Sequence, residues 1–282
     1  MMRAYPVASR VHGEEVYDKF LKTFTSIFKK FGIEVHDTIL DVDDVSKAKI
    51  DDVNVAIIAF LTGGTSKLAR VLAVRMGSKV PILLLAHNYH NSLASALSVK
   101  NKLLLEGFKL HLSLFDIGNE VSIEHAIISA KAVHDIYALK VLHLNEDGKS
   151  DEAVKFEDTF GCEVIPISKG ELKEELEKVS EEEVQEVIKR RLTIVDRSSI
   201  KNVEGLKHPI RLYVVSKRLL GAYGGNALTV ECFPFILEYK FTPCIALSLL
   251  NDDGVPAACE ADFKALLLLK LAHSLTGLPG WI

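Results

Sequence analysis

The sequence predicts an α/β protein built from two doubly wound domains, each with a parallel sheet. Short apolar, β-rich runs alternate with longer amphipathic stretches along the whole chain. This alternation is the strand–helix–strand order that produces a parallel sheet with helices on both faces. The length of 282 residues, divided by the roughly 150 residues of an average domain, indicates two such domains.

The composition excludes several classes of function. Hydrophobic residues make up 48% of the chain, charged residues 26%, and the net charge is −4. This is a globular composition with no basic surplus for nucleic acid or an anionic membrane. No apolar run approaches the roughly 20 residues of a membrane span, and the N-terminus lacks the apolar core of a signal peptide. We therefore expect a cytoplasmic protein with a small-molecule partner, no nucleic acid and no membrane.

The first domain is predicted to cover residues 1–139. Its strand-like runs are bounded by turn residues, and its helix-like stretches show a 3.6-residue apolar period. In the helix that starts at Asn91, this residue is expected to cap the N-terminus and Gly107 to end the helix. The strands are expected at 4–9, 33–40, 53–60, 81–87 and 108–115, and the helices at 14–31, 65–76, 91–106 and 122–139.

The second domain is predicted to cover residues 140–282. Ser168 and Ser180 each precede a glutamate by three residues, which predicts two helices within the charged segment 171–191. Thr242 before a proline predicts another capped helix start. The strands are expected at 141–144, 163–167, 227–231 and 255–260, and the later helices at 242–251 and 262–275.

The numbers and spacing of cysteine and glutamine indicate the redox state and the temperature in which the protein works. The cysteines are widely spaced, without a C-x-x-C pair, and we expect reduced thiols in the core. They are Cys162, Cys232, Cys244 and Cys259. Gln185 is the sole glutamine, whereas Lys and Glu are abundant. This bias is typical of proteins from hot environments, so we expect a thermophilic source.

Ligands of open α/β sheets bind at the carboxyl ends of the strands, so residues just after the strands are candidate contacts. After the strand ending at residue 60, Gly63 and Gly64 permit a tight turn into a helix N-terminus that favours anions or sugar oxygens. An ordinary strand-to-helix turn explains these glycines equally well.

A polar segment, AHNYHNSL, follows the strand ending at residue 87. Its hydrogen-bonding and aromatic groups suit a carbohydrate ligand, and its two histidines could also ligate a metal. Because no carboxylate lies nearby in the sequence, we favour a substrate contact or a subunit interface. The candidate residues are His87, Asn88, His90 and Asn91.

Acidic residues end two strands of the second domain. Glu231 follows one strand, and Glu260 with Asp262 follows the next. Neighbouring strands would bring these carboxylates to one edge, where hard oxygen ligands suit Mn²⁺ or Mg²⁺. Helix capping is the alternative interpretation, and Asp262 is well placed for it.

The run ECFPFILEYKFTPCIALSLLNDDGVPAACEADFKALLLLKLAHSLTG resembles the segment that carries the metal-binding acids in the fucose/arabinose isomerase superfamily. LTGGTSKLAR and NSLASALSVKNKLLLEG resemble a turn and a helix of the same family. The resemblance covers most of the chain and implies the Rossmann-like N-terminal and middle domains of fucose isomerase.

What the resemblance implies is an aldose–ketose isomerase that works through an enediol with a divalent metal, Mn²⁺ first and Mg²⁺ or Co²⁺ as alternatives. Glu231 matches the first metal carboxylate, and either Glu260 or Asp262 matches the second. Glu238 is a weaker match for the first. Glu231 and Asp262 would move the proton, and Arg10 would hold a distal hydroxyl of the sugar.

The family also has a β-rich C-terminal domain that supplies a metal-binding histidine, which we expect this chain to lack. His273 is expected to be a helix-face residue instead. The chain would then be a fragment, a shortened form, or a homo-oligomer in which a partner completes the site. The alternative to an isomerase is a non-catalytic carbohydrate-binding or regulatory protein, and a structural interaction module comes third.

Overall fold

The computed structural model describes residues 1–116, 121–191 and 204–280. The chain divides into two compact units, Met1–His134 and Asp135–Ile282, which are described separately below as unit 1 and unit 2. The sequence places the boundary after residue 139. The last two residues of the chain, 281–282, lie outside the described residues.

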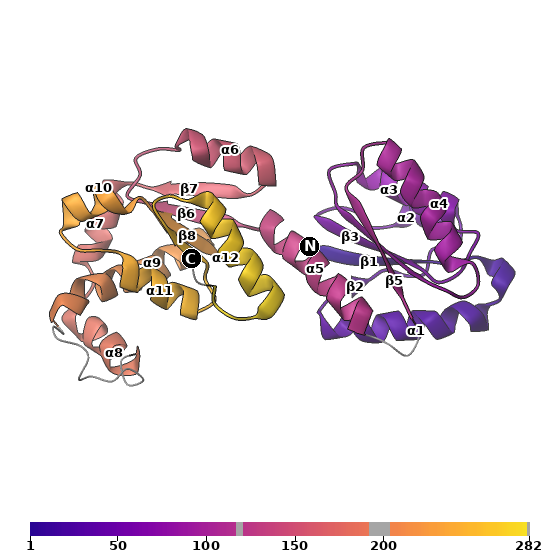
Figure 1. The fold of residues 1–282 in the computed structure, drawn as a ribbon, viewed down its shortest axis with the longest axis horizontal. Coiled ribbons are helices and arrows are strands. Elements are labelled where there is room, and N and C mark those ends of the chain that lie inside the picture. Colours follow the sequence, from indigo (N-terminus) through magenta and orange to yellow (C-terminus); the bar gives the residue numbers. More distant parts are fainter. Residues whose placement is uncertain (117–120, 192–203, 281–282) are drawn as a thin grey trace. The chain divides into compact units, whose positions relative to one another are not determined.

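Unit 1 contains one parallel five-stranded sheet in the order β2-β1-β3-β4-β5 (Figure 1). Its elements are β1 Met2–Val7, η1 Arg10–His12, α1 Glu14–Lys30, β2 Glu34–Val35, α2 Val42–Lys47, β3 Val55–Phe60, α3 Ser66–Met76, β4 Ile82–His87, α4 Ser92–Leu105, β5 Leu110–Phe115 and the greater part of α5 Val121–Tyr137.

Helices cover both faces of this sheet, and each face has its own core. Every residue of β3 and β4 is buried, as expected for central parallel strands that read as continuous apolar runs. Alternate residues of these strands face opposite ways. One set packs against α1 and α5, and the other packs against α2, α3 and α4.

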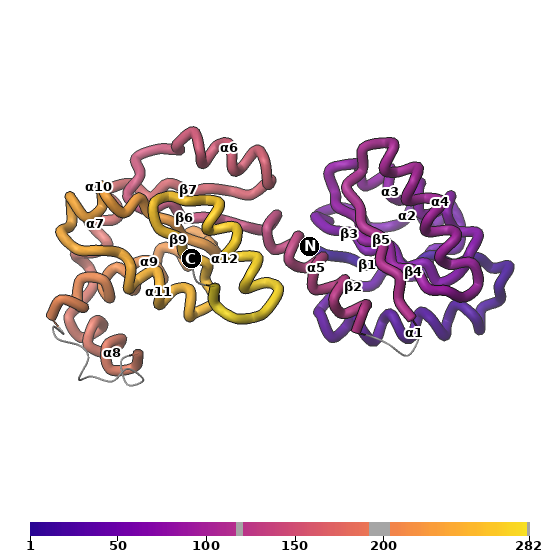
Figure 2. The backbone as a smooth tube through the Cα atoms, in the orientation of Figure 1, coloured from indigo at the N-terminus to yellow at the C-terminus, as the bar shows by residue number. Residues whose placement is uncertain are grey.

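Unit 2 repeats this winding with a parallel four-stranded sheet in the order β7-β6-β8-β9. Helices α6 and α12 pack on one face, and α7 to α11 pack on the other, as the backbone in Figure 2 shows. The elements are β6 Lys140–Leu144, α6 Asp151–Phe160, β7 Glu163–Ile167, α7 Lys169–Glu177, α8 Glu181–Arg191, η3 Glu204–Leu206, α9 Lys207–Tyr223, β8 Ala227–Val230, α10 Cys232–Tyr239, α11 Cys244–Asp252, β9 Ala257–Cys259 and α12 Phe263–Thr276.

The predicted fold class is confirmed, because both sheets are entirely parallel and carry helices on both faces. In each unit the first strand has the second strand on one side and the third strand on the other. The strand order therefore reverses between β1 and β3 in unit 1 and between β6 and β8 in unit 2. Ligands of such sheets bind at the carboxyl ends of the strands that flank this reversal.

Some local predictions were wrong. Asn91 precedes α4 but makes no side-chain capping bond, because its backbone is left-handed (φ 56°) rather than extended. Thr242 does not cap α11, which begins after Pro243. Of the four cysteines, only Cys232 is buried as expected, because Cys162 and Cys259 are half-buried and Cys244 is exposed on α11. No range was predicted for α2, α6, α9 or α10, and β2 is shorter than predicted.

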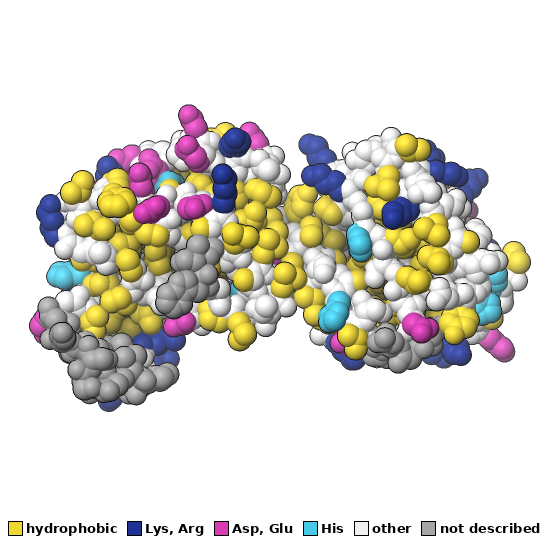
Figure 3. Space-filling model, viewed as in Figure 1, with side chains coloured by type: hydrophobic (Ala, Val, Ile, Leu, Met, Phe, Trp, Pro, Cys, Tyr) yellow, Lys and Arg dark blue, Asp and Glu magenta, His cyan; other side chains and the backbone are white. Residues whose placement is uncertain are grey.

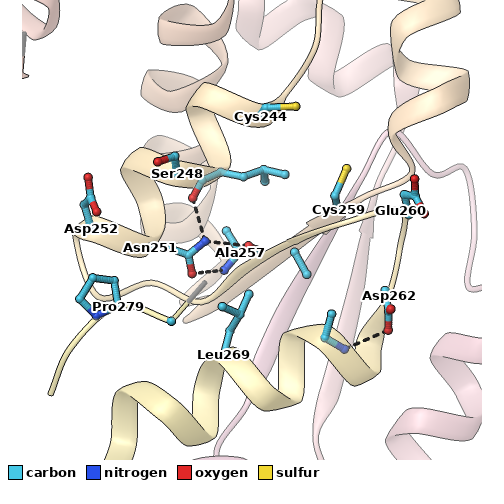
Figure 4. Close-up of a pocket in the computed structure, with 14 residues that line it drawn as sticks. Cys244, Ser248, Asn251, Asp252, Ala257, Cys259, Glu260, Asp262, Leu269 and Pro279 are labelled. Atoms are coloured by element: carbon cyan, nitrogen blue, oxygen red, sulfur yellow. Dashed lines mark hydrogen bonds between the residues drawn. The ribbon is translucent and has the colours of Figure 1, made fainter. Parts of the chain in front are cut away.

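Asn251 on α11 protects the open edge of β9. Its amide group donates to the carbonyl oxygens of Leu247 (3.0 Å) and Ala257 (2.8 Å), and its carbonyl accepts from the Ala257 amide at 3.1 Å (Figure 4). The side chain thus pairs with the outward-facing N–H and C=O groups of Ala257, as a neighbouring strand would. Unpaired groups at a sheet edge invite association with other chains, so this contact both anchors and shields the edge.

None of the helices in the described part of the chain is both long and apolar enough to cross a lipid bilayer.

Replacing Asn251 with leucine should destabilise unit 2 by about 3 kcal/mol, because both backbone groups of Ala257 lose a partner while size is preserved. Urea denaturation followed by circular dichroism measures the change. Asp252→Ala is the matched control, since this neighbouring side chain is exposed and should change stability by less than about 0.5 kcal/mol. Equal effects of the two substitutions would contradict the edge-anchoring role of Asn251.

Candidate functional site

The carboxyl edge of the unit 2 sheet gathers polar residues from three adjacent strands. Leu144 pairs with Val230, and Val230 pairs with Cys259. The residues that follow these three are Asn145, Glu231 and Glu260. Because neighbouring strands lie about 4.8 Å apart, the register sets Glu231 between Asn145 and Glu260 along this edge.

The carboxylate of Glu231 does not cap the helix that it precedes. Glu231 is exposed and stands at the N-cap position of α10, where its side chain makes no capping hydrogen bond. Its backbone carbonyl accepts from Phe235 at 3.3 Å. The carboxylate can therefore bind a cation, a sugar hydroxyl or a proton.

Glu260 is presented by an unusual turn. Glu260 and Ala261 both have left-handed backbones, at φ 59° and 51°, and the Ala261 amide donates to the Val230 carbonyl at 3.2 Å. Consecutive left-handed residues other than glycine cost conformational energy and tend to occur at functional sites. The exposed carboxylate lies beside a buried thiol, with Cys232 Sγ 3.8 Å from Glu260 Oε1.

Asp262 caps α12. Its Oδ1 accepts hydrogen bonds from the amides of Lys264 and Ala265, both at 2.9 Å. The capping interpretation of this residue is therefore confirmed, and one of its two carboxylate oxygens is already used. Glu238, the weaker candidate, lies one helix away from the strand end, in the last turn of α10.

A pocket of about 600 Å³ lies beside the edge strand β9. Figure 4 shows Cys244, Ser248 and Asp252 on its α11 side, and the strand end with Glu260 and Asp262 on the other. Leu269 and Pro279 also line it, whereas Glu231 does not. Figure 3 shows acidic side chains over the α6 region of unit 2, with lysine or arginine side chains beside them. The pocket itself is lined by Asp252, Glu260 and Asp262 and by no lysine or arginine among the described residues. Its lining therefore favours neutral or cationic ligands over anions.

Cys259 is not a reactive thiol at neutral pH. Burial, together with the hydrogen bond to the nearby Cys232, raises the pKa of Cys259 to about 12. A thiol with this pKa is uncharged at neutral pH, whereas metal ligation and nucleophilic attack require the thiolate. Cys259 is therefore not a candidate ligand or nucleophile.

The metal-ligand set predicted from the sequence is only partly assembled. Glu231, Glu260 and Asp262 share one edge, but across residues 1–116, 121–191 and 204–280 no three His, Cys, Asp or Glu side chains are grouped closely enough to hold an ion. His273 is on α12, as expected for a helix-face residue, with its ring against Gly254.

Two buried polar residues of this edge were missed by the sequence analysis. His143 on β6 is 1% exposed, and Asn145 is 6% exposed. Both ring nitrogens of His143 and the Oδ1 atom of Asn145 have no hydrogen-bond partner among the described residues. Burial lowers the pKa of His143, although the charges of Glu146 and Glu231 raise it. The available signal was a histidine and an asparagine in the buried run VLHLN, where a central parallel strand ends.

Gly63 of unit 1 is required by packing, and Gly64 is favoured by its backbone conformation. The Gly63 amide donates to the carbonyl of His90 at 2.6 Å, and a Cβ atom at Gly63 would lie 2.6 Å from the Cβ of Asn91. Gly64 has a left-handed backbone, at φ 75°, near Ser9. The structure thus brings the loops after β1, β3 and β4 together, and no larger residue fits at position 63.

His87 is part of this packing. It is fully buried, its Nδ1 accepts from the Tyr89 amide at 3.2 Å, and its Nε2 therefore donates to the Leu61 carbonyl at 3.0 Å. The ring stacks on Phe20 at 3.9 Å. Both nitrogens are used within the protein, which assigns a structural role to His87.

The other unit 1 candidates are exposed. Asn88, His90 and Asn91 lie on the surface of the loop after β4, where the His90 ring meets His12 edge-on at 5.8 Å. Arg10 lies in η1 and pairs with Asp41 at 3.2 Å. These side chains are accessible to a ligand.

Unit 1 should lose stability as the pH falls from about 6.5 towards 4. Burial lowers the pKa of His87 to about 4, whereas an unfolded histidine has a pKa of about 6.5. Between these pH values the unfolded chain binds a proton that the folded chain does not. The stability that neutral His87 contributes is therefore fully present above about pH 6.5 and is lost as the pH falls towards 4. Urea midpoints measured from pH 7.5 to 5.0 should fall less steeply for His87→Gln than for the wild type, and parallel slopes would contradict the assignment.

This chain is similar in sequence to a known sugar isomerase. No protein-family model matches this chain. A sulfoquinovose isomerase from Clostridium sp. (strain MSTE9) is 28% identical over a match of 202 positions, and the match covers 67% of this chain and 44% of that protein. The chain thus spans less than half the length of the curated relative it matches. The sequence of this chain is therefore similar to part of the sequence of a sugar isomerase.

Proposed function

We propose that this chain carries the carboxylate centre of an aldose–ketose isomerase in carbohydrate metabolism. The observation that carries the proposal is the register of β8 and β9, which sets the exposed carboxylates of Glu231 and Glu260 at adjacent strand ends. The likeness to a sulfoquinovose isomerase supports the same class of reaction. Sulfoquinovose is accordingly one of the sugars to test.

A divalent metal, Mn²⁺ foremost, fits the chemistry of these donors. Carboxylate oxygens are hard ligands that suit Mn²⁺ or Mg²⁺. The Glu231 side chain makes no capping bond to α10, and α12 is capped by Asp262 rather than by Glu260. Glu260 is a better second ligand than Asp262, whose Oδ1 already binds two amides. When bound, the metal would act as a Lewis acid towards the sugar oxygens.

The protein would move one proton between neighbouring carbons of the sugar. Glu231 takes the proton from C2, the C–H electron pair forms the C1=C2 bond of an enediol, and the O1 oxygen gains a proton from solvent. Because Glu231 is exposed, its carboxyl proton exchanges with solvent before Glu231 delivers a proton to C1. The O2 oxygen then loses its proton to solvent, which leaves a ketone at C2. No oxidant or reductant is needed, and a carboxylate at the strand end can act first as base and then as acid.

The purified chain with Mn²⁺ should convert at least one aldose to its ketose, in a panel that includes sulfoquinovose, L-fucose and L-arabinose. Glu231→Gln should lower the rate at least 100-fold, in line with the loss of a general base. Glu238→Gln is the matched control, because this glutamate is exposed on the same helix but lies away from the strand end. No ketose from any sugar, or equal rates in both variants, would refute the proposal.

Metal binding gives a second test. Mn²⁺ titration by calorimetry should show affinity weakened at least tenfold in Glu260→Gln and unchanged in Glu238→Gln. EDTA should abolish turnover, and Mn²⁺ should restore it. Sugar binding that survives both EDTA and the double substitution of Glu231 and Glu260 by glutamine, without turnover, would favour the non-catalytic carbohydrate-binding alternative.

A further inference from the structure

We propose that His143 and Asn145 form a hydroxyl-binding subsite between the ends of β6 and β8, and that it takes a neutral polyhydroxylated ligand. The inference names a ligand-binding element of the site described above, so its ligand class rests on the proposed function.

Burial of unpartnered polar atoms is the first argument. His143 is 1% exposed and Asn145 is 6% exposed, and no described residue bonds to either ring nitrogen or to Oδ1. A buried polar atom without a partner loses its hydrogen bonds to water and destabilises the fold, and native proteins contain few such atoms. Retaining such atoms at one strand end is expensive unless a ligand or solvent pairs with them.

The backbone of Asn145 is compatible with this role. Asn145 follows β6 with a left-handed conformation, at φ 65°, which asparagine adopts more readily than other residues except glycine. The conformation by itself is ordinary for asparagine, so the unpartnered buried Oδ1 atom carries the argument for a ligand.

The location agrees with a binding role. β6 and β8 are the strands between which the order of the unit 2 sheet reverses, which is where ligands of such folds bind. The His143 ring meets Phe263, at the start of α12, edge-on at 5.7 Å. Glu231 lies near enough to act on His143 electrostatically. The subsite therefore adjoins the carboxylate that we assign to proton transfer.

Charge and donor chemistry define the ligand class. The carboxylates that act on His143, those of Glu146 and Glu231, disfavour an anion. Asn145 Oδ1 only accepts hydrogen bonds, whereas a neutral imidazole offers one donor and one acceptor. A hydroxyl group can donate to Oδ1 and accept from the imidazole N–H, and two adjacent hydroxyls can serve both residues. This is the pattern of a polyol or a sugar.

The test measures binding of ribitol, D-arabinitol and D-sorbitol to the full chain by calorimetry, with and without Mn²⁺. At least one polyol should bind, and His143→Phe and Asn145→Gly should each weaken it at least tenfold. Lys240→Gly is the matched control, because Lys240 is exposed and also left-handed, at φ 63°. It relieves the same backbone strain in the same unit and should leave affinity unchanged.

Stability measurements guard against an unfolding artefact. His143→Phe removes two unpartnered polar atoms while keeping an aromatic ring, so its melting temperature should equal or exceed that of the wild type. If it fails to fold, Asn145→Gly decides the question alone. Ring signals of His143 in the wild-type NMR spectrum should also shift when the polyol is added.

The outcomes are distinguishable. Failure of every polyol to bind, or unchanged affinity in both variants, would overturn the subsite. Loss of Mn²⁺ affinity in the variants without polyol binding would overturn it in favour of a cation site. Polyol binding that depends on His143 and Asn145, with no ketose from any aldose, would support the subsite and refute the isomerase proposal.

Discussion

The register of β9 against β8 is the constraint on which the candidate site depends. The Leu228 amide bonds to the Pro256 carbonyl at 2.9 Å, and the Ala261 amide bonds to the Val230 carbonyl at 3.2 Å. These contacts extend the pairing past both ends of β9 and set Glu260 beside Glu231. Asn251 fixes the outer side of the same strand. A slip of one residue would turn Glu260 to the other face of the sheet, so the proposed chemistry requires this pairing.

The same edge concentrates energetic costs that folding alone does not explain. Glu260 and Asn145 have left-handed backbones, and His143 is buried without a partner among the described residues. The sheet core around them is otherwise mainly apolar, and the buried hydroxyl of Thr229 beside His143 is hydrogen-bonded to the Ala258 carbonyl. Strained backbones and unpartnered buried polar atoms are expected where a protein binds a ligand, because contacts with the ligand offset their energetic cost. At the corresponding edge of the unit 1 sheet, His90 and Asn91 are also left-handed. The difference is that the buried Gly63 and His87 are both satisfied there by packing and hydrogen bonds.

Much of the fold could be predicted from the sequence because its signals are local. Buried parallel strands such as 55–60 and 82–87 read as apolar runs, and Asp262 was identified as a possible cap from its position alone. Sequence could not reveal the left-handed backbone of Asn91, because this conformation arises from packing of the β4–α4 loop on Gly63. Nor could it reveal that His143 lies against Phe263, 120 residues further along the chain. Side-chain orientation and the contacts of distant elements arise only in the folded chain.

The most direct test of the account is solvent exchange. An isomerase that moves a proton through an enediol incorporates deuterium at the reacting carbon when the sugar is incubated with the enzyme in D₂O. Proton NMR of the recovered aldose and ketose should show deuterium at C2 of the aldose or C1 of the ketose with wild-type protein and Mn²⁺, and none above background with Glu231→Gln. Ketose formation in the wild type without any deuterium, or undiminished exchange in Glu231→Gln, would contradict the role assigned to this carboxylate.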